Sequence, residues 1–194
     1  VNEKAGQITY TQWLNDTGRL EADLTVIKLT DEKFMVVTSD IAHRHTETWM
    51  KRNLPEDQHV FITDVTSSYG QLNIQGPKSR ELLQSITHAN LSNEAFPFRC
   101  VKEIDIGLAR VMCVRITYAG ELGYELNIPS EQAIHVYDRI VEAGKNFGLR
   151  HAGLKSLASL RMEKGYRDYG HDIDNMDDPY SVGLGFAVRL DKES

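Results

Sequence analysis

Cysteine is scarce in this sequence, with only Cys100 and Cys113 among 194 residues. Two cysteines exclude a disulfide scaffold and any four-cysteine zinc site, and the alternating apolar stretch around Cys113 favours a small core residue. Seven histidines are scattered along the chain. The one close pair, His43 and His45, is two residues apart and therefore points to different sides of a helix. The sequence predicts neither a metal site nor a disulfide.

Positive charge and long apolar runs are lacking as well. The 22 Lys and Arg residues are outnumbered by 28 Asp and Glu residues, for a net charge of −6, whereas a nucleic-acid-binding surface needs a basic face. No apolar run approaches the roughly 18–20 residues that cross a bilayer, and residues 1–6 lack the apolar core of a signal peptide. We therefore expect no nucleic-acid partner and no membrane partner.

The sequence has no Gly-x-Gly-x-x-Gly turn, which holds the phosphates in dinucleotide-binding folds. No dinucleotide-binding domain is therefore expected within these residues. What is present is an ordinary globular composition, with 41% hydrophobic and 26% charged residues. The length is sufficient for one large domain or two small ones.

Alternating apolar residues, glycine turns and helix caps define the expected elements. We expect helices that begin after Ser39 or Asp40 and at Gly76-Pro77, helices at 130–143 and 154–164, and strands at 8–12, 20–29, 34–38, 59–65, 69–75, 100–106, 110–118, 123–128 and 184–190. Strands and helices are interspersed with mainly hairpin connections, which predicts an α+β fold of mixed or antiparallel sheets with packed helices. The expected subdomains are residues 1–66 and 67–194, both α+β. We expect an incomplete fragment of a longer protein, because the first strand has no partner before it.

The densest candidate for chemistry is the segment Tyr-Ala-Gly-Glu-Leu-Gly-Tyr-Glu at 118–125. Its two glycines predict a tight turn into a strand on which Glu125 and Asn127 face away from Tyr124 and Leu126. A carboxylate beside such a turn can bind a ligand that presents amidine-like N–H donors. The alternative is a hairpin with a polar outer face.

A second candidate carboxylate lies in the strand at 20–29. Leu20, Ala22, Leu24 and Val26 face one side of this strand, and Glu21, Asp23 and Thr25 face the other. A carboxylate there can act as a general acid or base if burial or a partner raises its pKa. The alternative is a half-buried strand with a solvated face.

Taken in order, these segments resemble the aminomethyltransferase family of the glycine cleavage T protein. They are more similar still to the folate-binding C-terminal half of FAD-dependent dimethylglycine and sarcosine dehydrogenases. Lys164 and the Leu-Gly-Tyr-Glu ending at Glu125 favour the dehydrogenase branch. The resemblance spans residues 6–192, and the matching stretches are 8–12, 14–15, 18 leading to 22–26, 75–77, 118–126, 160–166, 179 and 183–186.

The resemblance implies a tetrahydrofolate pocket. Asp23 matches the family's acidic position near the reacting folate nitrogens and is the expected catalytic residue. Glu125 matches the carboxylate that pairs with the N–H and amino donors of the pterin ring, for which a bidentate geometry suits. The other residues expected to bind folate are Tyr10, Leu24, Thr25, Tyr118, Leu126, Asn127 and Phe186, the last in a late strand.

The resemblance also implies a function: binding of tetrahydrofolate and capture of a one-carbon unit from N-methylglycine oxidation as 5,10-methylenetetrahydrofolate. FAD would belong to a missing N-terminal domain of the same protein, so the expected partners are folate, the one-carbon donor and that FAD domain. The implied location is the mitochondrial matrix in a eukaryote or the cytoplasm in a bacterium.

Two alternatives remain beside this function. One is a free-standing aminomethyltransferase of the glycine cleavage system, which is disfavoured because Leu157 stands where the T protein carries an arginine. The other is a non-catalytic regulatory relative of the same fold. The presence of both Asp23 and Glu125 disfavours that alternative.

Overall fold

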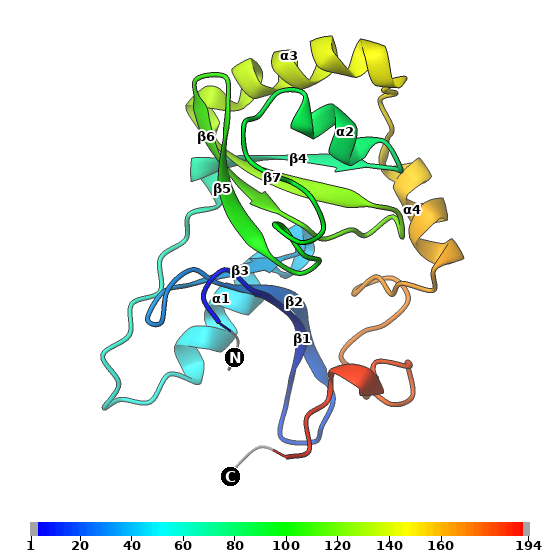
Figure 1. Cartoon of the computed structure of the whole chain (residues 1–194). Coiled ribbons are helices and arrows are strands. Elements are labelled where there is room, and N and C mark those ends of the chain that lie inside the picture. The colour runs from blue at the N-terminus through cyan, green and yellow to red at the C-terminus, as the bar shows by residue number, and fades with distance from the viewer. Residues whose placement is uncertain (1–3, 192–194) are drawn as a thin grey trace. The chain divides into compact units, whose positions relative to one another are not determined.

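The computed structural model of the protein describes residues 4–191. Strands and helices are interspersed along the chain in the order that Figure 1 shows. Short 3-10 turns, including Asp40–Ala42 and Gly185–Ala187, complete the structure. The regular elements are β1 (Ile8–Leu14), β2 (Leu20–Lys28), β3 (Phe34–Thr38), α1 (His43–Arg52), β4 (Tyr69–Gln75), α2 (Ser79–Gln84), β5 (Val101–Ile106), β6 (Ala109–Val114), β7 (Gly123–Pro129), α3 (Ala133–Gly144) and α4 (Leu154–Glu163).

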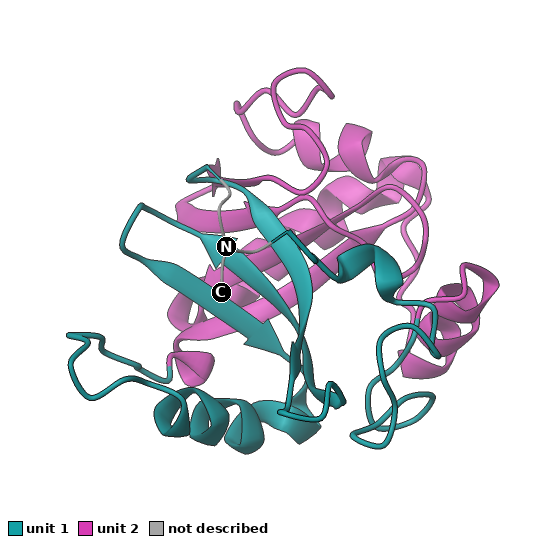
Figure 2. Cartoon of the chain, turned by 90° about the horizontal axis from the view of Figure 1, so that it is seen from below, with its two compact units in different colours: residues 1–64, 167–194 teal, residues 65–166 magenta. Residues whose placement is uncertain are grey.

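The chain divides into two compact units, coloured separately in Figure 2. Unit 1 consists of residues up to 64 together with those from 167 onwards, and unit 2 consists of residues 65–166. The sequence analysis instead assigned the segment from 167 onwards to the second subdomain. The structure groups this segment with unit 1 because Leu20 of β2 packs against Ile173 and Leu184 in one buried cluster.

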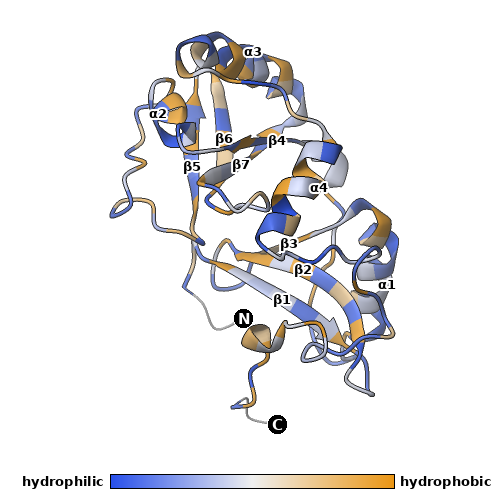
Figure 3. Cartoon of the chain, turned by 90° about the vertical axis from the view of Figure 1, so that its right-hand side faces the viewer, coloured by the Kyte–Doolittle hydropathy of each residue, from blue (hydrophilic) through white to orange (hydrophobic). Residues whose placement is uncertain are grey.

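Unit 1 is built on an antiparallel sheet in the order β1-β2-β3. Alternation along β2, visible as alternating colours in Figure 3, buries Ala22, Leu24 and Val26 with half-buried Val36 of β3 on one face. The helix α1 lies against this face, where the buried Thr46 donates a hydrogen bond to the Thr38 hydroxyl over 3.3 Å. The opposite face carries Asp23 and Thr25. It also carries Leu20, which the alternation had placed with Ala22: the β1–β2 register shifts between Trp13 and Leu14, so Leu20 packs near Tyr10 in a separate cluster.

Unit 2 is built on an antiparallel sheet in the order β4-β7-β6-β5. Tyr124, Leu126 and Ile128 of β7 are fully buried, and they pack with Cys113 of β6 in the main core. The helices α2 and α3 cover this face of the sheet (Figure 1). The alternation that the sequence predicted for residues 123–128 is therefore confirmed, and it leaves Glu125 on the face away from the core.

Two expected strands are wrong. Residues 59–65 form no strand, because their apolar side chains find no sheet partner: Phe61 is 82% exposed. A hydrogen bond of 3.0 Å between His43 Nε2 and Asp64 Oδ2 attaches the end of this segment to α1. Residues 184–190 contain the 3-10 turn Gly185–Ala187 where a strand was expected. Within residues 4–191, no helix has the length and apolar character needed to cross a membrane.

The buried face of β7 yields a stability prediction. Leu126→Ala is expected to lower the free energy of unfolding by about 2–5 kcal/mol, because a fully buried leucine is replaced by a cavity. Urea denaturation followed by circular dichroism measures this loss. Leu108→Ala is the matched control, since Leu108 is 91% exposed at the β5–β6 turn. Equal losses in the two variants would contradict the assignment of β7 to the core.

Candidate active site

Asp23 lies in the middle of β2, directly opposite Gln12 of β1. The Gln12 side-chain amide Nε2 donates a hydrogen bond of 2.7 Å to Asp23 Oδ1. The side chain of Tyr10, two residues earlier on the same face of β1, also hydrogen-bonds to Asp23. Cross-strand register therefore fixes the Asp23 carboxylate with two neutral partners.

Burial raises the pKa of the Asp23 carboxyl above its usual range, because removal from water disfavours the charged form. The hydrogen bonds from Gln12 and Tyr10 favour the carboxylate and oppose this rise. The negative charge of Asp168 adds to it. A carboxyl group balanced in this way can exchange a proton nearer neutral pH than an exposed aspartate does.

Two stacked aromatic rings lie near Asp23. The rings of Tyr10 and Phe186 are stacked, with centroids 6.3 Å apart and an interplanar angle of 23°. Phe186 is 76% exposed, so one of its faces is available to a flat ligand. Thr25 pairs with Tyr10 across the strands and shares this face. Leu24 points to the opposite face of the sheet, into the apolar cluster with Ala22.

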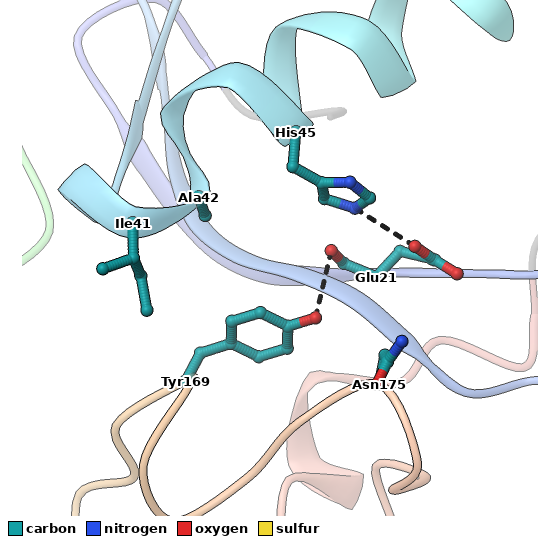
Figure 4. A pocket seen from close by; sticks show the side chains of 6 residues that line it. All are labelled: Glu21, Ile41, Ala42, His45, Tyr169 and Asn175. Atoms are coloured by element: carbon teal, nitrogen blue, oxygen red, sulfur yellow. Dashed lines mark hydrogen bonds and ion pairs between the residues drawn. The ribbon is translucent and has the colours of Figure 1, made fainter.

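A cavity of about 180 Å³ lies in unit 1, between β2, α1 and the segment that follows residue 167 (Figure 4). His45 and Tyr169 both point to Glu21: His45 Nε2 lies 3.1 Å from Glu21 Oε2, and the Tyr169 hydroxyl donates to the Glu21 carbonyl over 3.3 Å. Burial raises the pKa of Tyr169, and the negative charges of Glu21, Asp174 and Asp23 raise it further. Glu21 is the acidic side chain among the residues that line this cavity.

Glu125 is the corresponding carboxylate of unit 2. It lies on β7 between Asn73 of β4 and Val114 of β6. Gln71 Nε2 donates a hydrogen bond of 3.2 Å to Glu125 Oε2. Burial raises the pKa of the Glu125 carboxyl above its usual range. Asn127 shares this face of β7 and is buried, whereas Leu126 points into the core.

The loop that precedes β7 carries Tyr118, whose ring stacks on that of Tyr166 with centroids 6.1 Å apart and an interplanar angle of 16°. Gly120 takes a φ of 70°, which L side chains rarely adopt. Gly123 is required for a different reason: a Cβ there would overlap the amide of Gln75, which accepts a hydrogen bond of 2.7 Å from Thr117. The two glycines therefore set the path of the chain into Glu125.

The structure brings the expected site residues together in two groups. Tyr10, Asp23, Thr25 and Phe186 meet in unit 1, while Tyr118, Glu125 and Asn127 belong to unit 2. The sequence analysis missed Gln12, Gln71 and Tyr166, which contact these residues. Alternation along β1, which places Gln12 on the same face as Tyr10, is the signal that could have identified Gln12.

The two close histidines have different partners, as their spacing predicted. His43 pairs with Asp64, and His45 pairs with Glu21. Among the residues that the structure describes, no group of three or more His, Cys, Asp or Glu side chains is arranged to hold a metal ion.

Comparison with known proteins assigns the family. The GCVT N-terminal domain family matches residues 1–192. The chain belongs to this family. The resemblance drawn from the quoted segments is therefore confirmed, and the chain is called the GCVT domain below.

Three relatives match almost the whole GCVT domain. 4-Methylaminobutanoate oxidase (formaldehyde-forming) of Paenarthrobacter nicotinovorans is 37% identical over 192 residues, which cover 99% of this chain and 23% of the oxidase. Mitochondrial sarcosine dehydrogenase of Mus musculus is 34% identical over 207 residues, covering 98% of this chain and 22% of the dehydrogenase. The mitochondrial pyruvate dehydrogenase phosphatase regulatory subunit of Mus musculus is 33% identical over 188 residues, covering 96% of this chain and 21% of the regulatory subunit. The chain thus spans less than a quarter of the length of each relative.

A solved structure supports the fold. The crystal structure of glycine cleavage system aminomethyltransferase T from Bartonella henselae superimposes with a TM-score of 0.81 at 23% identity, covering 97% of this chain and 49% of that one. This likeness confirms the predicted α+β fold of the glycine cleavage T protein type.

The half-buried carboxylates of the GCVT domain yield a prediction for stability against pH. The folded pKa values of Asp23 and Glu125 are raised by burial, so the folded protein binds these protons more tightly than the unfolded chain does. Stability is therefore lost as pH rises from the ordinary carboxyl range through the raised pKa values. Asp23→Asn and Glu125→Gln should raise the Tm near pH 7, by about 2–4 °C per kcal/mol gained, and the gain should vanish at low pH.

Differential scanning calorimetry across the pH range measures these differences. Glu103→Gln is the matched control, because Glu103 lies on β5 with its side chain 61% exposed and pairs with Arg110 at the surface. This variant should show no gain. A gain in the control equal to that of the buried variants, or a gain that grows toward low pH, would contradict the interpretation.

Proposed function

We propose that the GCVT domain binds tetrahydrofolate and captures a one-carbon unit from the oxidation of an N-methylglycine, as part of a protein of the dimethylglycine or sarcosine dehydrogenase type. One observation carries this proposal: each unit presents a half-buried carboxylate with a raised pKa on the polar face of a strand, and an aromatic stack in the same group of residues. A flat, donor-rich heterocycle that carries a nucleophilic amine suits such a set of groups.

Glu125 fits the pterin end of the ligand. Within residues 4–191 its hydrogen-bond partner is Gln71, which occupies Oε2. Oε1 is therefore available to an N–H donor of a ligand, and two adjacent donors of a pterin can hydrogen-bond to the two oxygens of the carboxylate. Burial of Glu125 strengthens such charge-assisted bonds, because water competes less for the carboxylate. Tyr118 supplies an aromatic face in the same unit.

Asp23 fits the reacting end. When bound, tetrahydrofolate supplies two nitrogens that form carbon–nitrogen bonds with a formaldehyde-level carbon, and the carbonyl oxygen leaves as water. Asp23 accepts the proton that a reacting nitrogen loses and returns a proton to the departing oxygen. The stack of Tyr10 and Phe186 offers the reacting end of the ligand an aromatic surface near Asp23.

Oxidation of the amine would take place elsewhere in the protein. FAD needs a phosphate-binding glycine turn at the N-terminus of a helix, and these residues contain no such motif. The proposal therefore assigns FAD and amine oxidation to a separate domain of the same protein, and assigns one-carbon capture to the GCVT domain. The names of two relatives, a formaldehyde-forming oxidase and a sarcosine dehydrogenase, support this division.

A non-catalytic regulatory role is the second candidate, and one relative favours it. That relative is a phosphatase regulatory subunit with 33% identity. A module that had lost the chemistry would have no need to retain the unfavourable burial of Asp23. An aminomethyltransferase working alone is less well supported, because the half-buried Leu157 of α4 presents no charge to a folate.

Glu125→Ala is expected to weaken folate binding by about 2–4 kcal/mol, or about 30-fold to 1000-fold in Kd, because the pterin donors lose their charged acceptor. Isothermal titration calorimetry with 5-formyltetrahydrofolate, which resists oxidation, measures the change. Glu121→Ala is the control, since this exposed carboxylate lies in the same loop. Equal affinities for wild type and Glu125→Ala would overturn the assignment.

Asp23→Asn is expected to separate binding from transfer. The amide keeps the size of the side chain and a hydrogen bond to Gln12, so the Kd for 5-formyltetrahydrofolate should stay within about threefold of wild type. Enzyme-dependent formation of methylenetetrahydrofolate from formaldehyde should fall by about 100-fold, because an amide accepts no proton. Asp31→Asn, an exposed change after β2, should keep both properties. Transfer at the wild-type rate in Asp23→Asn would refute the proton-transfer role.

A further inference from the structure

Gln12 is the side chain that holds Asp23, and neither the family motifs nor the proposed chemistry gives it a role. We propose that Gln12 is a positioning residue, which orients the Asp23 carboxylate so that it meets its ligand as a proton acceptor. This inference rests on the proposed function of Asp23, although its test uses no folate.

The first argument is geometric. Gln12 and Asp23 are directly opposed in the β1–β2 register, where side chains on one face lie close enough to interact. The hydrogen bond from Nε2 to Oδ1 is 2.7 Å long and partly buried. It is short for an amide donor, as expected when the acceptor is charged. The contact therefore fixes one carboxylate oxygen in a defined place on the strand face.

The second argument concerns charge. The groups that act on the Asp23 carboxylate are the donors Gln12 and Tyr10 and the negative Asp168, and Asp23 in turn acts on Tyr169. A lysine or arginine at position 12 would hold the carboxylate ionised so firmly that it would be a poor base. An apolar side chain would leave burial unopposed and would favour the protonated acid. A neutral amide donor favours the carboxylate less strongly than a cation would and more strongly than an apolar side chain would.

The third argument concerns the proton itself. A primary amide neither gains nor loses a proton in the range where enzymes work. Gln12 can therefore stabilise the Asp23 carboxylate without competing for the proton that Asp23 receives.

The test is a titration of Asp23 by NMR in the chain labelled with carboxyl-¹³C aspartate. The Asp23 resonance is assigned by its loss in Asp23→Asn. In Gln12→Met, which keeps the length of the side chain but has no donor, the Asp23 midpoint should move to higher pH. In Gln12→Lys it should move to lower pH. This reversal of sign is a readout that a merely structural role of Gln12 would not produce.

Thr11→Val is the matched control, because Thr11 is adjacent in β1 but points to the opposite face. Its Asp23 midpoint should equal that of wild type. The proposal is overturned if the Asp23 midpoint in Gln12→Met shifts by no more than it does in Thr11→Val. It is also overturned if Gln12→Met and Gln12→Lys move the midpoint in the same direction. Should one variant fail to fold, the direction seen in the other decides. Absence of folate binding by the wild-type chain, measured separately by calorimetry, would overturn the proposed function and leave this titration result standing.

Discussion

The two-residue period of the β-strand is the constraint on which the site depends. In β2, the burial of Ala22, Leu24 and Val26 forces Asp23 and Thr25 to the other face. In β7, the burial of Tyr124, Leu126 and Ile128 does the same for Glu125. A slip of one residue would exchange the two faces, placing a carboxylate in each core and a leucine in each site. The apolar packing of each sheet therefore holds its carboxylate in register.

Both carboxylates are partnered by glutamine amides: Gln12 donates to Asp23, and Gln71 donates to Glu125. A neutral donor satisfies part of the hydrogen-bonding capacity of a buried acid without neutralising its charge. Each carboxylate then retains both a high pKa and an affinity for further donors. These groups cost stability in the free protein, which is typical of residues kept for binding or chemistry.

Local patterns predicted β2, β4 and β7 well, because each has a clear apolar face. They failed at residues 59–65 and 184–190, where apolar side chains such as Phe61 occur in sequence without a sheet edge to pair with. The packing of Ile173 and Leu184 against Leu20 joins residues about 150 positions apart, which no local pattern encodes. Asp23 and Glu125 were singled out from alternation and motif, whereas Gln12, Gln71 and Tyr166 emerged only when the strands were paired and the loops placed.

The discontinuity of unit 1 has a consequence for the order of synthesis. A ribosome completes every residue of unit 2 before it makes the segment that carries Ile173, Leu184 and the carbonyl of Asp177, which accepts a hydrogen bond of 3.0 Å from the Leu20 amide. Unit 2 is continuous in sequence and can therefore fold as soon as it leaves the ribosome. At that stage the segment that covers one face of β1 and β2 has not yet been made. Asp23 acquires its aromatic neighbour Phe186 only at the end of translation of this region. The surroundings of Asp23 are thus completed by the last residues of this region to be made.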